Sequence, residues 1–147
     1  MCSSDLSASH RVAASSRLEA ATRWLAEQAE TRSLAVGYFG ASTGAAAALR
    51  VAASLGSAIG AVVSRGGRPD LAWSALHQVR APTLLIVGGL DDVVIELNQR
   101  AFERLGGGKE LIIIPGATHL FEEPGALQEV ARLASGWFKR YLLNKQT

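Results

Sequence analysis

The residues best suited to chemistry in this chain are the pentapeptide Gly-Ala-Ser-Thr-Gly at positions 40–44. A β-like apolar run, residues 34–39, precedes it, and an alanine-rich helical run, residues 45–53, follows it. A serine between two glycines in a strand–turn–helix setting is typical of a nucleophile held on a sharp turn. The spacing therefore makes Ser42 a candidate nucleophile and indicates acyl-transfer or hydrolytic chemistry.

Small residues around this serine serve the geometry of the turn. We expect Gly40 and Gly44 to let strand and helix approach without side-chain clashes, with Ser42 in a strained, positive-φ conformation. The N–H of Thr43, at the start of the helix, would then point toward a developing oxyanion.

A serine nucleophile needs a base to accept its proton and an acid to orient that base. Asp91 and Asp92 follow the apolar run at residues 83–87, and His119 follows the run at residues 109–114. Because the carboxyl ends of parallel strands meet at one edge of a sheet, these side chains should emerge beside Ser42. The residues themselves leave both aspartates open as the acid, and either could be an ordinary turn residue.

His10 and His77 are the competing bases. His10 lies in the N-terminal segment and His77 lies before the run at residues 83–87, so neither follows a strand. We therefore prefer His119.

Two arginines follow the apolar run at residues 59–63. Arg65 and Arg68 could bind an anionic group of a substrate, and the alternative is a solvated loop with local ion pairs. Glu122 and Glu123, after His119, are interpreted as a charge cluster near a helix N-terminus.

The elements that must position these groups alternate along the chain. Apolar spacing predicts helices at residues 16–29, 45–53, 71–76, 95–105 and 126–143, and buried strands at residues 34–39, 59–63, 83–87 and 109–114. Asp70 is expected to cap the short helix at residues 71–76. The last helix should turn five residues inward: Val130, Leu133, Ala134, Trp137 and Phe138. This order predicts an α/β fold, with about four parallel strands and helices on both faces.

Composition excludes several other classes of protein. The chain has 147 residues, 48% of them hydrophobic and 19% charged, which suits one globular domain. A net charge of +2 without a basic stripe does not support nucleic-acid binding. No apolar stretch is long enough to span a membrane, and the N-terminus lacks a signal-peptide pattern. The single cysteine, Cys2, excludes an intramolecular disulfide, and we expect a cytoplasmic protein without metal or cofactor.

The N-terminal segment has two interpretations. Residues 2–6, Cys-Ser-Ser-Asp-Leu, match the translation of a common sequencing-adapter end, although they could equally be an ordinary polar terminus. We expect residues 1–16 to be disordered or artefactual and residues 17–147 to form the folded domain.

Four segments resemble the α/β-hydrolase superfamily and, more narrowly, its dienelactone-hydrolase-like group, over a match from about Arg17 to the C-terminus. They are residues 37–46, 64–71, 85–91 and 115–125. The resemblance implies that Ser42 is the nucleophile, His119 the general base and Asp91 the triad acid, because that acid stands in a Gly-Gly-x-Asp pattern. It also implies that some relatives carry a fused phosphoribosyltransferase domain.

The chain departs from this group in two ways. Dienelactone hydrolases proper have cysteine where Ser42 stands, so the serine favours general ester or thioester chemistry. In this group several strands normally precede the nucleophile elbow, the turn that holds Ser42 at residues 40–44. Their absence implies that the chain is N-terminally truncated and forms the C-terminal half of the fold. One oxyanion donor would then be lost, which lowers turnover about a hundred- to thousandfold, and the exposed sheet edge would promote self-association.

The sequence thus predicts a serine hydrolase acting on small-molecule carboxylic esters or related acyl compounds. The alternative is a non-catalytic α/β fragment or accessory domain with an incomplete active site.

Overall fold

The fold is built on one parallel sheet of four strands. The computed structural model describes residues 3–143, with side chains from residue 9 onward. The strands are β1 (Val36–Ala41), β2 (Ile59–Arg65), β3 (Thr83–Gly88) and β4 (Lys109–Ile114). They lie in the order β1-β2-β3-β4, and every neighbouring pair is parallel. The predicted four-stranded parallel sheet is confirmed.

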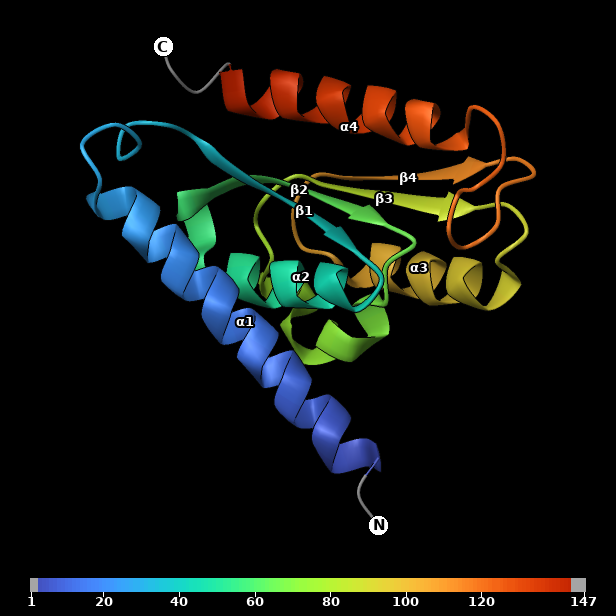
Figure 1. Cartoon of the computed structure of the whole chain (residues 1–147), viewed down its shortest axis with the longest axis horizontal. Coiled ribbons are helices and arrows are strands. Elements are labelled where there is room, and N and C mark those ends of the chain that lie inside the picture. The colour runs from blue at the N-terminus through green and yellow to red at the C-terminus, as the bar shows by residue number, and fades with distance from the viewer. Residues whose placement is uncertain (1–2, 144–147) are drawn as a thin grey trace.

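Helices cover both faces of the sheet, as predicted (Figure 1). They are α1 (Ser3–Glu27), α2 (Thr43–Leu55), η1 (Gly56–Ala58), η2 (Pro69–Gln78), α3 (Asp92–Arg104) and α4 (Ala126–Leu142), where η marks a 3-10 helix. Helices α2 and α3 lie against one face and α4 against the other, while α1 packs on α2 (Figure 1). None of the helices between residues 3 and 143 combines the length and apolar character that a membrane span requires.

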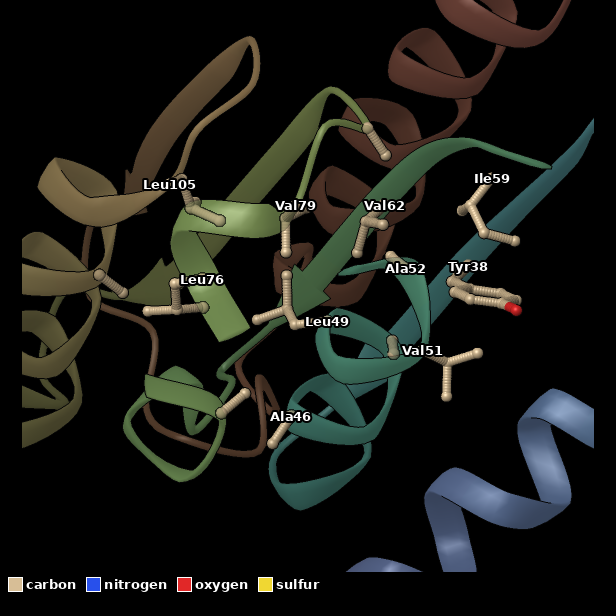
Figure 2. Packing of buried hydrophobic residues seen from close by; sticks show 14 of the residues in the cluster. Tyr38, Ala46, Leu49, Val51, Ala52, Ile59, Val62, Leu76, Val79 and Leu105 are labelled. Atoms are coloured by element: carbon tan, nitrogen blue, oxygen red, sulfur yellow. The ribbon is translucent and has the colours of Figure 1, made fainter. Parts of the chain in front are cut away.

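The two central strands are apolar throughout because both of their faces are covered. All residues of β3 are buried, and so are all residues of β2 except its last. One core cluster joins the sheet to α2 and η2, where Leu49, Val62 and Leu76 meet (Figure 2). The other joins the sheet to α4. Of the five residues expected to face inward from that helix, Val130, Ala134 and Trp137 are buried in this cluster, and Leu133 and Phe138 are partly buried and pack against it.

Helix α1 differs from its predicted range. It begins at Ser3 rather than near residue 16, so residues 3–16, which we expected to be disordered or artefactual, are helical, and it ends at Glu27. The side chain of Thr22 ties it to the sheet, because its hydroxyl lies 2.5 Å from the Tyr38 hydroxyl of β1. Burial raises the pKa of Tyr38, although the hydrogen bond with Thr22 opposes that effect.

The predicted cap at Asp70 is wrong. The helix η2 begins at Pro69, so Asp70 lies inside its first turn instead of before it. Its carboxylate accepts hydrogen bonds from Nε and Nη2 of Arg68, at 3.0 and 2.9 Å. Asp70 therefore stabilises the loop in front of η2 through an ion pair and not through helix capping.

Candidate active site

Ser42 lies at the sharp turn between β1 and α2. Its backbone has φ 52° and ψ −122°, a conformation that residues other than glycine rarely adopt. Such strain costs on the order of 1–3 kcal/mol and persists where the surrounding structure enforces it. The expected strained turn is therefore present at Ser42.

Only one of the two flanking glycines has the predicted role. A Cβ on Gly40 would lie 2.6 Å from the Cα of Ala45, so the strand and the helix approach there as closely as expected. A Cβ on Gly44 would meet no atom within 4 Å, and the predicted clash at that position is wrong. Gly44 is exposed on α2, whereas Gly40 is buried beneath it.

Thr43 is the first residue of α2. The first N–H groups of a helix have no acceptor within the helix, and they carry the partial positive charge of the helix N-terminus. The Thr43 N–H lies at this positive end of α2, directly after Ser42 in the chain.

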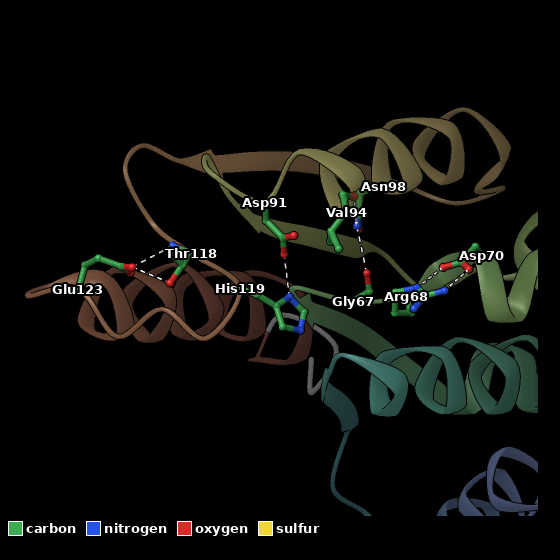
Figure 3. A network of polar contacts seen from close by, with 9 residues as sticks. All are labelled: Gly67, Arg68, Asp70, Asp91, Val94, Asn98, Thr118, His119 and Glu123. Carbon is green, nitrogen blue, oxygen red and sulfur yellow. Dashed lines mark hydrogen bonds and ion pairs between the residues drawn. The ribbon is translucent and has the colours of Figure 1, made fainter. Parts of the chain in front are cut away.

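Asp91 and His119 are brought together at the carboxyl edge of the sheet. Asp91 lies between β3 and α3, and His119 lies in the loop after β4. Oδ2 of Asp91 is 2.7 Å from Nδ1 of His119 (Figure 3). Asp92 is exposed and begins α3, so Asp91 is the aspartate that meets the histidine. When Nδ1–H donates to the carboxylate, Nε2 is left as an acceptor that can take a proton.

One loop connects Ser42 to this pair. The N–H of Ser42 donates to the carbonyl of Arg65 at 3.2 Å, and the N–H of Arg68 donates to the carbonyl of Ser42 at 3.1 Å. Between these two arginines, a Cβ on Gly66 would lie 3.3 Å from Nδ1 of His119. Ser42 and His119 therefore border the same short loop.

The structure does not join the Ser42 hydroxyl to His119 by a hydrogen bond within residues 3–143. Catalytic hydrogen bonds are often long before substrate binds, and a serine hydroxyl can change rotamer. The Asp91–His119 half of the expected triad is thus formed, while the Ser42–His119 half is not.

The two arginines have different surroundings. Arg68 is held by Asp70, whose hydrogen bonds raise the pKa of the guanidinium. The guanidinium carbon of Arg65 lies 5.5 Å from the centre of the Phe121 ring, and its buried Nε has no hydrogen-bond partner among the described residues. Arg68 thus corresponds to the predicted local ion pair, and Arg65 does not.

The competing histidines also differ in position. His77 is exposed on η2. His10 lies on α1 and lines, with Arg11 and Ala14, a cavity of about 330 Å³ against Thr43 and Gly44. Among residues 3–143, His119 is the histidine that contacts a carboxylate.

The same range contains no group of three or more His, Cys, Asp or Glu residues that could hold a metal ion. Cys2 lies outside the described residues.

Two further residues, Asn98 and Glu123, form hydrogen bonds to segments beside the site, and neither contact was expected from the sequence. Asn98 is fully buried on α3, and its Nδ2 donates to the carbonyl of Gly67 at 3.1 Å, which anchors the loop beside Ser42. Its position on the buried face of α3, one turn after Val94, was the available signal. Glu123 lies just before α4, near a helix N-terminus as expected, and its carboxylate also accepts hydrogen bonds from Thr118, next to His119. No spacing rule in the sequence indicated that contact.

A parallel sheet with a strained serine at a strand–helix turn and an Asp–His pair at the same edge defines the α/β-hydrolase class. A sequence model of the dienelactone hydrolase family matches residues 3–142. The chain therefore belongs to the dienelactone hydrolase family.

Solved structures agree with this assignment. A dienelactone hydrolase from Anabaena variabilis superposes with a TM-score of 0.86 at 62% identity, over 87% of this chain and 59% of that one. A dienelactone hydrolase-like promiscuous phosphotriesterase from metagenomic libraries superposes with a TM-score of 0.63, over 86% of this chain and 62% of that one. Its identity is 20%, so it shows the fold alone.

A curated relative adds information on length. A protein of Mycobacterium tuberculosis (strain H37Rv), provisionally named a phosphoribosyl transferase, is 62% identical over 127 residues. The match covers 86% of this chain and 29% of that protein. The chain thus spans less than a third of this relative.

Proposed function

We propose that this chain carries the catalytic residues of a serine hydrolase that acts on carboxylic esters or related acyl compounds. The observation that carries the proposal is the 2.7 Å contact between Asp91 and His119 beside the loop that also holds Ser42. Membership of the dienelactone hydrolase family supports hydrolytic chemistry.

The proposed reaction runs through an acyl-enzyme. The Ser42 hydroxyl attacks the acyl carbon while Nε2 of His119 takes its proton. The Thr43 N–H stabilises the oxyanion, and the imidazolium then returns the proton to the leaving alcohol. Water, activated by the same imidazole, releases the acid from Ser42. Asp91 keeps the imidazole in the required tautomer throughout.

Arg65 is the better of the two arginine candidates for contact with a substrate. Its Nε is buried without a hydrogen bond among the described residues, whereas Arg68 already forms two with Asp70. An anionic group on the substrate would satisfy the guanidinium of Arg65.

We extend the proposal to the longer relatives. The name of the M. tuberculosis protein and the 29% coverage support fusion of this hydrolase domain to a phosphoribosyltransferase domain. The proposed setting is the cytoplasm, which suits a chain with a single cysteine.

A fluorophosphonate probe, which labels activated serines, tests the assignment of Ser42. We expect the unaltered chain to be labelled and Ser42→Ala to lose labelling completely, because the attacking oxygen is gone. Ser57→Ala is the matched control, since Ser57 is exposed on η1 outside the site and its loss should leave labelling unchanged. Labelling that persists in Ser42→Ala would contradict the assignment.

The missing hydrogen bond between Ser42 and His119 favours a second candidate, a non-catalytic accessory domain. Under that alternative neither the chain nor a longer relative containing the same three residues would be labelled or hydrolyse simple esters. Labelling of either protein at Ser42 would exclude it.

A further inference from the structure

We propose that Glu123 is a positioning residue for His119, holding the loop after β4 so that the imidazole meets Asp91. This inference rests on the proposed function, because it assigns Glu123 a role in the same site. Within residues 3–143, Glu123 itself forms no hydrogen bond or ion pair with Ser42, Asp91 or His119.

One carboxylate oxygen of Glu123 accepts hydrogen bonds from both donor groups of Thr118, the residue before His119. Oε1 of Glu123 accepts a hydrogen bond from the Thr118 N–H at 3.1 Å and from the Thr118 hydroxyl at 2.6 Å (Figure 3). These bonds lower the pKa of Glu123, so the carboxylate is ionised and can act as a charge-assisted acceptor. These two hydrogen bonds fix the backbone of Thr118, the residue next to the proposed base His119.

The same loop packs against the segment that carries Asp91. The carbonyl of Ala117 accepts a hydrogen bond from the N–H of Leu90 at 3.0 Å, one residue before Asp91. A Cβ on Gly88 would lie 2.4 Å from that carbonyl oxygen, so the two segments are in close contact. Movement of the loop would therefore change the geometry between Asp91 and His119.

The loop also contains a conformation that must be held by its neighbours. Phe121 has φ 55° although it is not glycine, and its side chain is 1% exposed. Its N–H donates to the carbonyl of Thr118 at 3.1 Å. Thr118 is thus held on two sides. Its N–H and hydroxyl donate to Glu123, and its carbonyl accepts from Phe121.

Loss of Glu123 should reduce the rate of reaction more than it reduces binding. Without the carboxylate, the donors of Thr118 turn to water and the loop relaxes. A misplacement of about 1 Å at a reacting group can lower the rate about a hundredfold. We therefore expect Glu123→Ala to lower the maximal rate of fluorophosphonate labelling by about ten- to a hundredfold. The probe concentration at half-maximal rate should stay within about twofold of the unaltered chain.

Three variants separate positioning from general damage. Glu123→Gln keeps an acceptor oxygen and should recover part of the labelling rate. Thr118→Ser keeps the hydroxyl and should label at the original rate, whereas Thr118→Val removes that donor and should label more slowly. Glu122→Ala is the matched control, because Glu122 is an exposed neighbour and should not change the rate.

Proton NMR detects the hydrogen bond between His119 and Asp91 directly and requires no enzymatic turnover. The Nδ1–H proton of His119, hydrogen-bonded to Asp91, should give a strongly downfield resonance in the unaltered chain. It should broaden or vanish in Glu123→Ala and remain in Glu122→Ala. If Glu123→Ala does not fold, as judged by circular dichroism, the Thr118→Ser and Thr118→Val pair supplies both readouts.

The outcomes distinguish the two proposals. If neither the unaltered chain nor a longer relative with the same three residues is labelled, the proposed function is contradicted, while the NMR comparison still decides the role of Glu123. A labelled chain in which Glu123→Ala, or the fallback Thr118→Val, keeps both the original rate and the downfield resonance overturns the positioning role.

Discussion

Asp91 and Asp92 are neighbours in the chain, yet their carboxylates lie in different surroundings. The Asp91 side chain is 17% exposed and faces Nδ1 of His119, while Asp92 is exposed in the first turn of α3. A carboxylate that accepts a hydrogen bond from Nδ1–H stabilises the imidazolium formed when Nε2 takes a proton. A carboxylate at the helix start instead interacts with the helix dipole.

We predict that Asp91→Asn lowers the rate of labelling at Ser42 by about 10³- to 10⁴-fold, because the amide favours the wrong imidazole tautomer. Asp92→Asn, the matched control, should stay close to the original rate. Measurement of probe labelling against time gives both values. An equal loss in the two variants would show that the choice of Asp91 is wrong.

At the scale of elements, the approach of β1 to α2 is what places Ser42. The strand ends at Ala41 and the helix begins at Thr43, so a single residue makes the turn. A reversal this short brings the backbone of Ala45 against the Cα of Gly40. Any side chain at Gly40 would push the helix away from the strand.

We predict opposite effects on stability for two glycine substitutions in this region. Gly40→Ala should lower the free energy of unfolding by about 1–3 kcal/mol, because its Cβ would overlap the backbone of Ala45. Gly44→Ala should raise it by about 0.5–1 kcal/mol, because the residue lies in a helix with open space around it. Urea unfolding followed by circular dichroism measures both. A shift of the same sign in the two variants would be inconsistent with this geometry.

At the scale of the whole molecule, the two outer strands of the sheet differ in composition. Within residues 3–143, β1 pairs only with β2, and β4 pairs only with β3. Strand β4 begins with Lys109 and Glu110, whereas β1 contains no charged residue and its Phe39 is 51% exposed. Charged residues on an edge strand discourage pairing between molecules, so β1 is the edge more open to association.

We predict that the chain self-associates through β1 and that Phe39→Lys weakens the association. The new charge would be brought close to its copy in a second molecule, and this repulsion opposes pairing. Sedimentation velocity at several concentrations measures the effect. Ile113→Lys is the matched control, since Ile113 is exposed on β4 and its change should leave the association intact. A chain that is monomeric at every concentration would refute the prediction.

The sequence by itself determined the elements and their order. Strand β4 was predicted with its observed bounds, and β3 and α4 ended within one residue of theirs, because apolar periodicity is a local property of the chain. The position of Ser42 was also predictable, since a strand–turn–helix with small residues has its own pattern. The start of α1 and the role of Asp70 were not, because helix ends depend on weak local signals.

Only the tertiary structure decided which side chains meet. The residues left Asp91 and Asp92 open, the family resemblance favoured Asp91, and the contact with His119 depends on how β3 and β4 present their loops. The contact of Glu123 with Thr118 follows from a loop that reverses at Phe121, which no periodicity records. Local patterns specify helices and strands, whereas contacts between loops depend on the packing of the sheet that carries them.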